Sequence, residues 1–526
     1  MDRLGDVGVS VSYRNQYSQY SRGHCMTAIA IIFISILYLM IVSMLFTYGL
    51  NFFYLSYQAA KQNKRGSEEI SEVDEWPRVT VQLPVYNERH VAERLIRSAA
   101  QMDYSNEKLE IQVLDDSTDE TVQIIAQVVD QLKAKGLDIK HVHRKKREGY
   151  KAGALKNGFE SATGEFMALF DADFVPSRNF LKKTIPHFGN TEVGFVQARW
   201  GHINSENSLL THIQSLSIDA HFVVEQFARF TGGYWFNFNG TAGVWRRQAI
   251  EDAGGWTADT LTEDLDLSYR MQLKGWKANF LRDVVVPAEL PVTMNGYRRQ
   301  QHRWARGSLE CAIKLLPRVW ESKAPLRIKA QSTLHLTGYL VHVLMFSLNL
   351  LYPIVVLLSQ QYPQLISLFG ITILFNLTAF APSVFFLTAQ SQLGRKWLPL
   401  VPSIALVSIA GMGMMINTVR AALQTVQKKA FPFERTPKFG ATEGGNDWVK
   451  SNYKLKMDPI IFYELIFAVF NLGIVGMGIY FGNIFITVFA AIYSTGLFFT
   501  SGYTIAQSLH VRQKQLAQKL ALEEQK

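Results

Sequence analysis

The chain has 526 residues, and lysine plus arginine exceed aspartate plus glutamate by 54 to 44. The basic excess lies largely beside apolar segments, where anionic headgroups and the positive-inside rule account for it, so we expect no nucleic-acid partner. Only two cysteines occur, Cys25 and Cys311, far apart in the sequence and without metal-ligand spacing, so they indicate neither a disulfide framework nor a zinc site.

Three long stretches contain no charged residue: 23–60, 330–394 and 465–511. About 20 apolar residues are enough for a helix to cross a bilayer. The first stretch holds one such helix. It is longer than the apolar core of a signal peptide and does not end in small residues, so we interpret it as an anchor. The other two stretches each divide at turn-like residues into two helices, which gives five spans.

Basic residues flank the spans but are missing from the hairpin tips, so the basic ends are expected in the cytoplasm. The apolar segment 397–427 is long enough to be a sixth span. If it crossed, the basic stretch after it would lie outside, against the charge rule, so we interpret it as an interfacial or re-entrant helix on the cytoplasmic side. The predicted order is an extracytoplasmic tail (1–25), span 1 (26–56), a cytosolic domain (76–325), spans 2 and 3 (330–390), the interfacial helix (397–427), a cytosolic loop (428–458), spans 4 and 5 (459–507) and a cytosolic tail (508–526).

The segment between the first two spans alternates short apolar runs with helical patterns. Strands are expected at 79–83, 110–114, 139–142 and 166–170. Alternation of this kind predicts an α/β fold with a doubly wound, mostly parallel, Rossmann-like sheet. Ligands of such sheets bind at the carboxyl ends of the strands, so chemistry is expected there.

Polar residues follow three of these strands, in Pro84-Val-Tyr-Asn-Glu88, Asp115-Asp-Ser-Thr-Asp119 and Asp171-Ala-Asp173. Each alone could be a helix cap or a turn, but the coincidence at successive strand ends favours a site. Asp171 and Asp173, two apart on an extended chain, would share one face. Two carboxylates so placed would repel each other unless a hard divalent cation is bound, so we expect Mg²⁺ or Mn²⁺.

Three later segments add chemistry. Lys151 lies between glycines at the start of a predicted helix, where backbone N–H groups favour phosphate. Glu263 and Asp264 open another helix; they could be capping carboxylates, but Asp264 is also a candidate general base, with Glu263 as its alternate. The basic segment around Arg303 and Trp304 could be a solvated face beside the membrane, or it could hold a diphosphate and stack on a sugar ring.

In this order the motifs resemble the processive branch of glycosyltransferase family 2, the cellulose-synthase and cellulose-synthase-like group. The elements that carry the resemblance are Pro84-Val-Tyr-Asn-Glu88, Asp115-Asp116, Lys151-Ala-Gly-Ala-Leu155, Asp171-x-Asp173, Thr262-Glu-Asp264 and Gln300-x-x-Arg303-Trp304. They cover roughly residues 76 to 310. Bacterial cellulose synthases have more spans before the catalytic domain and a cyclic-dinucleotide module after the membrane region, so the organisation here looks closer to plant mannan and xyloglucan-backbone synthase-like proteins.

The resemblance implies a glycosyltransferase A-type fold and inverting transfer of a hexose from UDP-glucose or GDP-mannose. Asp264 would be the catalytic base, and Asp171 and Asp173 the metal ligands. The 238–245 segment looks like the family's acceptor-side loop, and the 433–440 segment is similar to its gating loop. The residues implied in nucleotide-sugar binding are Pro84, Tyr86, Glu88, Asp115, Asp116, Lys151, Asp171, Gln300, Arg303, Thr436 and Lys438, and those implied in acceptor binding are Asn239, Gly240 and Trp304.

The expected product is therefore a β-linked glucan or mannan, made processively by a multi-pass membrane enzyme whose catalytic domain is cytoplasmic. A non-processive transferase that glycosylates a lipid, similar to ceramide or diacylglycerol glucosyltransferases, is the alternative. A catalytically inactive scaffold or a transporter has no support, because every expected acid is present. The acceptor, glycan or lipid, and the oligomeric state stay open at this point.

Overall fold

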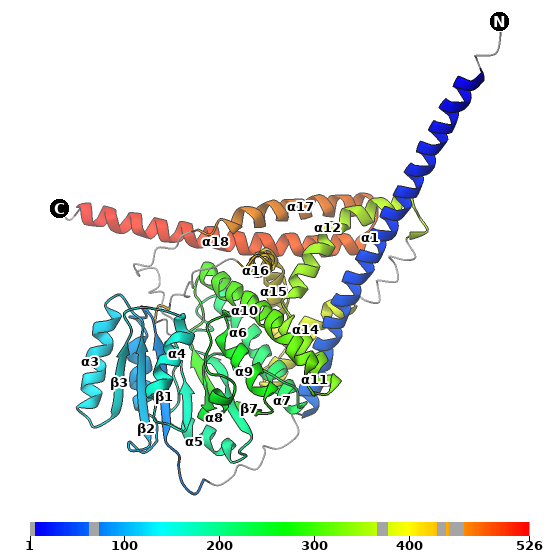
Figure 1. The fold of residues 1–526 in the computed structure, drawn as a ribbon. Coiled ribbons are helices and arrows are strands. Elements are labelled where there is room, and N and C mark those ends of the chain that lie inside the picture. The colour runs from blue at the N-terminus through cyan, green and yellow to red at the C-terminus, as the bar shows by residue number, and fades with distance from the viewer. Residues whose placement is uncertain (1–5, 63–72, 366–376, 429–437, 441–456, 525–526) are drawn as a thin grey trace.

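The computed structural model describes residues 6–62, 73–365, 377–428, 438–440 and 457–524. An α/β domain occupies one side of the molecule, and long helices lie across it (Figure 1). The first helix, α1 (Asp6–Gln62), runs from the flank of this domain to a far projecting N-terminus. The termini of the chain are therefore both on the helical side, away from the sheet.

The α/β domain is built on one seven-stranded sheet with the order β3-β2-β1-β4-β6-β5-β7. Strands β1, β2, β3 and β4 are parallel, β6 runs antiparallel to β4 and β5, and β7 is parallel to β5. The strands are β1 (Val79–Val85), β2 (Leu109–Asp115), β3 (Asp138–His143), β4 (Phe166–Leu169), β5 (Val193–His202), β6 (Gly243–Arg246) and β7 (Lys277–Ala288). The predicted mostly parallel, doubly wound sheet is confirmed.

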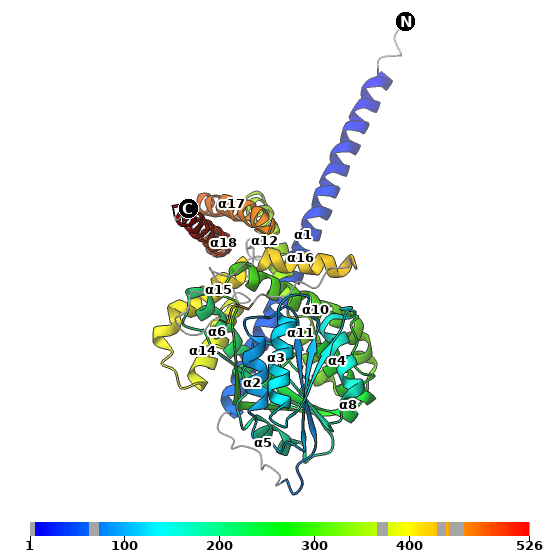
Figure 2. The same ribbon diagram turned by 90° about the vertical axis from the view of Figure 1, so that its left-hand side faces the viewer.

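Helices cover both faces of the sheet. Figure 2 shows the sheet nearly on edge, with α2 (Ala92–Ala100) and α3 (Thr121–Lys133) on one side and α4 (Tyr150–Ser161) and α8 (Arg247–Asp252) on the other. Because both faces are covered, the central strands are buried along nearly their whole length: β4 is entirely apolar, and β2 is fully buried although it carries Glu110, Gln112 and Asp115.

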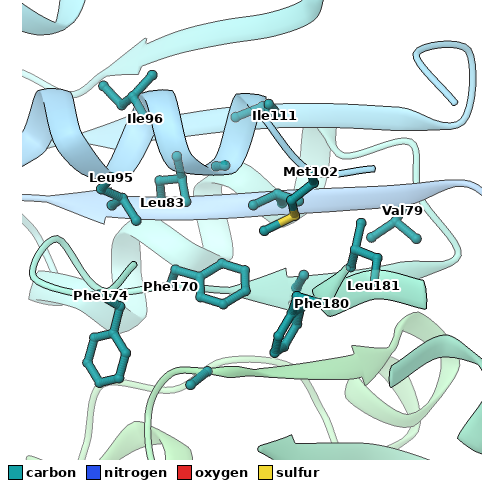
Figure 3. Packing of buried hydrophobic residues seen from close by; sticks show 14 of the residues in the cluster. Val79, Leu83, Leu95, Ile96, Met102, Ile111, Phe170, Phe174, Phe180 and Leu181 are labelled. Atoms are coloured by element: carbon teal, nitrogen blue, oxygen red, sulfur yellow. The ribbon is translucent and has the colours of Figure 1, made fainter. Parts of the chain in front are cut away.

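The larger core lies under α2 and α3. Leu95 and Ile96 of α2 pack over Leu83 and Ile111 of the sheet, and Phe170, Phe174 and Phe180 continue the same cluster past the end of β4 (Figure 3). Burial of such side chains stabilises the fold by about 1.5–3 kcal/mol each. This core holds the carboxyl ends of β1 and β4 rigidly at one edge.

The remaining described elements of this domain and its connections are short or lie beside the sheet. They are α5 (Phe180–Thr184), η1 (Ile185–Phe188), α6 (Leu209–Ala220), the π-helix η2 (His221–Gln226), α7 (Phe227–Thr231), α9 (Glu263–Leu273), α10 (Met294–Glu321) and α11 (Leu326–Leu336). Helix α10 carries the predicted Gln-x-x-Arg-Trp motif and leads from β7 toward the long apolar helices.

Five of the described helical segments are long and apolar enough to cross a membrane, judged by length and composition alone: Ala28–Gln62, Leu340–Gln361, Leu398–Val426, Ile460–Tyr480 and Ile484–Lys514. Four of them correspond to predicted spans. The corresponding helices after α1 are α12 (Leu340–Gln361), α17 (Ile460–Tyr480) and α18 (Ile484–Glu524). The predicted span at 365–389 lies partly outside the described residues, and the described part forms η3 (Leu377–Phe380) and α14 (Ala381–Gln392).

The predicted interfacial segment is helical but broken. It consists of η4 (Leu398–Leu400), α15 (Val401–Gly413) and α16 (Met415–Val426), with Met414 between the last two. Ile404 and Val407 of α15 pack against Leu210 and Ile213 of α6 in the α/β domain. Length alone would let this segment cross a bilayer, so its interfacial placement stays a prediction.

Candidate active site

A cavity opens at the carboxyl edge of the sheet, between the ends of β1, β4, β5 and β7 and the helices α9 and α10. The predicted site residues that line it are Pro84, Tyr86, Glu88, Asp116, Lys151, Asp171, Asp173, Asn239, Gly240, Glu263, Asp264, Gln300, Arg303, Trp304 and Lys438. Residues as far apart in the chain as Pro84 and Lys438 thus share one cavity, as the strand-end argument required. Thr436 lies outside the described residues.

The end of β1 forms one wall. The guanidinium of Arg147 lies 3.5 Å from the centre of the Tyr86 ring, in a cation–π contact. Asn87, next in the chain, has a positive φ of 53°, and its side-chain oxygen accepts a hydrogen bond from the Thr118 amide at 2.8 Å. These contacts tie the loop after β1 to the loops after β2 and β3.

The two aspartates after β2 do different things. Asp116 lines the cavity and is held by a bidentate ion pair with Arg144, at 2.7 and 2.6 Å. Asp115 is fully buried, is not among the cavity-lining residues, and binds His141 and His143 of β3 instead. The sequence did not decide which of the two residues would contact the nucleotide. Of the two, only Asp116 reaches the cavity.

Lys151 connects the acidic groups of the site. It lies in the first turn of α4, and its ammonium is 2.5 Å from Asp171 Oδ1, 3.7 Å from Glu263 Oε1 and 2.8 Å from the Gly240 carbonyl oxygen, to which it donates. Burial would lower the pKa of Lys151, but Asp171 and Glu263 outweigh it and the pKa is raised. Lys151 is therefore a fixed positive charge in this cavity.

Asp264 lies in the first turn of α9, beside Glu263. Burial raises its pKa to about 7, and the negative charge of Glu263 adds to the rise, while Lys151 partly opposes it. A carboxyl group with a pKa near neutrality can accept a proton and release it again, which is the property that a general base needs. The raised pKa is compatible with the predicted role of Asp264 as a base, which stays a prediction.

The Asp171–Asp173 segment is a turn and not an extended chain, so that part of the prediction is wrong. Strand β4 ends at Leu169, and the Phe174 amide donates to the Asp171 carbonyl at 3.0 Å. Both carboxylates still reach the cavity, because the turn brings Asp171 to Lys151 and Asp173 to Lys438 Nζ at 2.7 Å. The shared face arises from the turn and not from strand alternation.

The 238–245 segment closes the cavity next to Asp264. Gly240 has a φ of +77°, and a Cβ there would lie 3.3 Å from Asp264 Oδ2 and 3.5 Å from Lys151 Nζ. Asn239 is oriented from behind by His221 Nε2, 2.9 Å from its amide nitrogen, and by Gln197, whose side-chain oxygen accepts from the Asn239 amide at 2.8 Å. His221 opens the π-helix η2, an element that is rare and often occurs at functional sites.

Helix α10 supplies the wall nearest the long apolar helices. Trp304 lies beside Trp200, with ring centroids 6.3 Å apart. Among the described residues, Gln300 Oε1 and Trp200 Nε1 are buried and have no hydrogen-bond partner. Buried polar atoms are nearly always paired, so unpaired atoms on a cavity wall indicate where a bound ligand would supply the partner.

Among the cavity residues that sequence reasoning missed are Trp200 and Glu289. Trp200 lies near the end of β5, and Glu289 directly follows β7. Burial raises the pKa of the Glu289 carboxyl above its usual range. The strand-end rule that found the other acids would have found both residues, but only the first four strands were recognised in the sequence.

Among the described residues, acidic and basic groups line the cavity in unequal numbers. Seven carboxyl groups, of Glu88, Asp116, Asp171, Asp173, Glu263, Asp264 and Glu289, stand against the four cationic side chains of Arg147, Lys151, Arg303 and Lys438. Ammonium groups already stand beside both predicted metal ligands. An all-oxygen donor set with surplus negative charge suits a hard divalent cation, so Asp171 and Asp173 fit the expected Mg²⁺ or Mn²⁺.

Residues 77–307 match the family described as "Glycosyltransferase like family 2". This segment is therefore similar to glycosyltransferase family 2 domains. Two rice relatives (Oryza sativa subsp. japonica) agree with the cellulose-synthase-like branch that the motifs resemble. "Probable glucomannan 4-beta-mannosyltransferase 7" is 42% identical over 307 residues, which are 57% of this chain and 52% of the relative. "Probable glucomannan 4-beta-mannosyltransferase 11" is 44% identical over 253 residues, 47% of this chain and 44% of the relative. The chain thus spans about half the length of these relatives.

Solved structures were also compared. The mannosyltransferase PcManGT from Pyrobaculum calidifontis, in complex with GDP-Man and Mn2+, aligns with 76% of this chain and 100% of that chain, at 21% identity and a TM-score of 0.49. TarS from S. aureus aligns with 60% of this chain and 55% of that chain, at 17% identity and a TM-score of 0.36.

Proposed function

We propose that the protein is a membrane-embedded hexosyltransferase that transfers a sugar, with inversion, from a nucleotide diphosphate-sugar to a growing β-glycan. One observation carries the proposal: Asp264, with its pKa of about 7, stands beside Lys151 in a cavity that also holds the Asp171–Asp173 pair and Arg303. A base and a set of groups for a diphosphate are together the requirements of a single-displacement sugar transfer.

In the proposed reaction, an acceptor hydroxyl oxygen attacks the anomeric carbon of the donor sugar. Its proton passes to the Asp264 carboxylate as the new C–O bond forms. The bond from the anomeric carbon to the diphosphate breaks, and the nucleoside diphosphate leaves with the electron pair. Arg303 and Lys151 lie where they can stabilise the negative charge that develops on the leaving group.

A divalent cation held by Asp171 and Asp173 would neutralise part of the diphosphate charge when bound. The residues of this chain do the rest. Asp116, fixed by Arg144, and Tyr86, covered by Arg147, form the wall at which we place the nucleoside. Trp304 and Trp200, with the unpaired Gln300 oxygen, form the opposite wall, at which we place the acceptor sugar.

The names of the rice relatives support GDP-mannose as the donor, with UDP-glucose as the competing candidate. The test is to incubate the purified protein with each donor in turn, with Mg²⁺ or Mn²⁺ and a short mannan or glucan primer, and to measure the released nucleoside diphosphate and the length of the product. Transfer from neither donor to any acceptor would overturn the proposal.

The glycolipid-forming alternative differs in its product. A processive synthase yields radiolabelled polymer that is insoluble in chloroform, whereas a lipid transferase yields label in chloroform-soluble material and none in polymer. The packing of α15 and α16 against α6 and α10 supports the interfacial placement of 398–426, and with it a cytoplasmic catalytic domain and a cytoplasmic 428–458 loop. Of that loop, Lys438 reaches the cavity.

A further inference from the structure

A second cluster of ligating side chains lies outside the cavity, at the edge of the sheet. Asp115 Oδ2, at the end of β2, is 2.8 Å from His141 Nε2 and 3.1 Å from His143 Nδ1 on the neighbouring edge strand β3. Each residue offers one ligand atom, and all three atoms lie within 4.8 Å of one another. Nothing in the proposed sugar transfer uses the two histidines.

The backbone arranges this cluster. In the parallel pairing of β2 with β3, Asp115 is opposite His143, and His141 lies two residues earlier on the same strand. Side chains two apart on a strand share a face, so both imidazoles point to the side of the sheet that Asp115 occupies. The site is therefore preformed by strand register and does not depend on a flexible loop.

We propose that Asp115, His141 and His143 form a binding site for a transition-metal cation of the Zn²⁺ class, separate from the Asp171–Asp173 pair. Two imidazole nitrogens and one carboxylate oxygen are ligands that Zn²⁺ accepts, whereas Mg²⁺ prefers oxygen alone. The two sites thus differ in donor chemistry, so we expect each to prefer a different metal ion.

Two of the three separations between ligand atoms are close to those of a loaded site, and the third, between the two imidazole nitrogens, is within 4.8 Å. Tetrahedral ligands about 2.0–2.1 Å from Zn²⁺ lie roughly 3.3 Å from one another, so the two measured separations need to open by only a few tenths of an ångström. The other carboxylate oxygen, Asp115 Oδ1, accepts the Ser117 amide at 2.8 Å, which holds the carboxylate and leaves Oδ2 for the ion. Such support from behind a ligand is typical of metal sites.

Solvent access also fits. The Asp115 side chain is 0% exposed, but His141 is 16% and His143 is 34% exposed, so an ion can enter from solvent and water can complete its shell.

The position suggests a structural role with a link to the cavity. Asp116 directly follows Asp115, and Arg144 directly follows His143. These two neighbours make the bidentate ion pair of the cavity wall. An ion bound between β2 and β3 would fix the positions at which the loops after these two strands begin. It would thereby fix the geometry of the Asp116–Arg144 ion pair.

The test uses the full-length protein in detergent, with Asp171→Asn and Asp173→Asn introduced to remove the oxygen-only pair and all metal stripped by a chelator. Titration with Co²⁺, a visible reporter of tetrahedral sites, should give d–d absorption that saturates at one equivalent, and Zn²⁺ should displace the Co²⁺ stoichiometrically. Thermal unfolding followed with Zn²⁺ should show a rise in Tm that Mg²⁺ does not produce.

Adding His141→Gln and His143→Gln should abolish the Co²⁺ band and the Zn²⁺-dependent rise in Tm. The matched control adds His187→Gln and His212→Gln, which lie on other elements, and should keep both signals. If the glutamine pair does not fold, Asp115→Asn in the same background is the second variant, and it should weaken Co²⁺ binding at least tenfold. No stoichiometric band in the first protein, or a band that survives loss of His141 and His143, would overturn the proposal. Neither result depends on sugar transfer, so it leaves the proposed function untouched.

Discussion

Two buried charged centres of this molecule are built in opposite ways. Around Lys151 in the cavity, one ammonium faces the carboxylates of Asp171, Glu263 and Asp264. Between α10 and α17, Arg298 and Glu464 are both 0% exposed and form a bidentate pair, with Nε to Oε1 at 3.0 Å and Nη2 to Oε2 at 2.6 Å. The first centre has more acid than base, and the second is balanced one to one.

The partners of the second centre complete it. Thr504 accepts from the Arg298 guanidinium at 2.5 Å, Ser501 donates to Glu464 at 2.8 Å, and Asn417 donates to the Arg298 carbonyl at 3.0 Å. Helices α16, α17 and α18 are thus fastened to the helix that carries Gln300, Arg303 and Trp304. A fully satisfied buried pair specifies a geometry, whereas an unbalanced centre shifts a pKa and can do chemistry. The difference separates a structural site from the proposed catalytic one.

The largest expected effect comes from Asp264→Asn at the unbalanced centre. Loss of a general base should lower kcat by roughly 10²–10⁴-fold, while the nucleotide, bound at other groups, should keep its affinity. Steady-state transfer and calorimetric titration with GDP and UDP measure the two quantities. The control is Asp259→Asn. Asp259 precedes α9 and its carboxylate pairs with Lys314, so this variant should keep a kcat near that of the wild type. A kcat for Asp264→Asn within about threefold of the wild type would remove the base assignment.

The substitution Glu464→Gln at the Arg298–Glu464 pair should lower the free energy of unfolding. It leaves the Arg298 charge buried and unpaired, which costs about 3–5 kcal/mol. Denaturant unfolding in detergent measures the loss. Replacing both partners, by Arg298→Met with Glu464→Met, should recover most of it, because neither charge then remains. Asp138→Asn, which breaks the exposed Arg78–Asp138 pair, should cost only about 0–1 kcal/mol. Equal losses of unfolding free energy in Glu464→Gln and in the Arg298→Met, Glu464→Met double variant would contradict this interpretation.

The pH dependence of kcat/KM should report the raised pKa of Asp264. Because burial and Glu263 raise the pKa of Asp264 to about 7, the base is protonated below that pH, and kcat/KM should rise roughly tenfold per pH unit up to about 7 and then level off. The same group acts oppositely on stability. Its pKa is above the ordinary value of 3.8, so its stabilising contribution is present below about pH 4 and is lost as the pH rises through 7. A flat kcat/KM between about pH 5.5 and 7.5 would argue against Asp264.

The smallest effect expected is that of Gly240→Ala. The +77° φ makes any side chain strained, by about 1 kcal/mol, and the new Cβ would also crowd Asp264 Oδ2. Gly275→Ala is a matched control, because its φ is +96° and nothing lies within 4 Å of the added Cβ. Both variants should lose similar stability in thermal unfolding, but only Gly240→Ala should also lose kcat, by a few-fold. Equal kcat in the two variants would show that the approach to Asp264 is unimportant.

Much of this organisation is local and could be read from the sequence. The strands β1 to β4 were expected within one or two residues of their observed ends, because apolar runs bounded by polar turns define buried parallel strands. Their order along one edge then placed Asp171, Asp173 and Asp116 in one cavity. The strands β5 to β7 were not recognised, and Trp200 and Glu289 were missed with them.

The sequence by itself predicted most of the acids, bases and aromatic side chains that line the cavity, because sheet topology brings the ends of parallel strands to one edge. Only the tertiary structure decided how the charged side chains pair. Lys151 stands between Asp171 and Glu263, and Arg298 meets Glu464. Asp115 turns away to two histidines, while Asp116 faces the cavity. Those pairings join residues from distant parts of the chain, and side-chain direction and local dielectric arise only after packing, so no pattern of neighbouring residues encodes them.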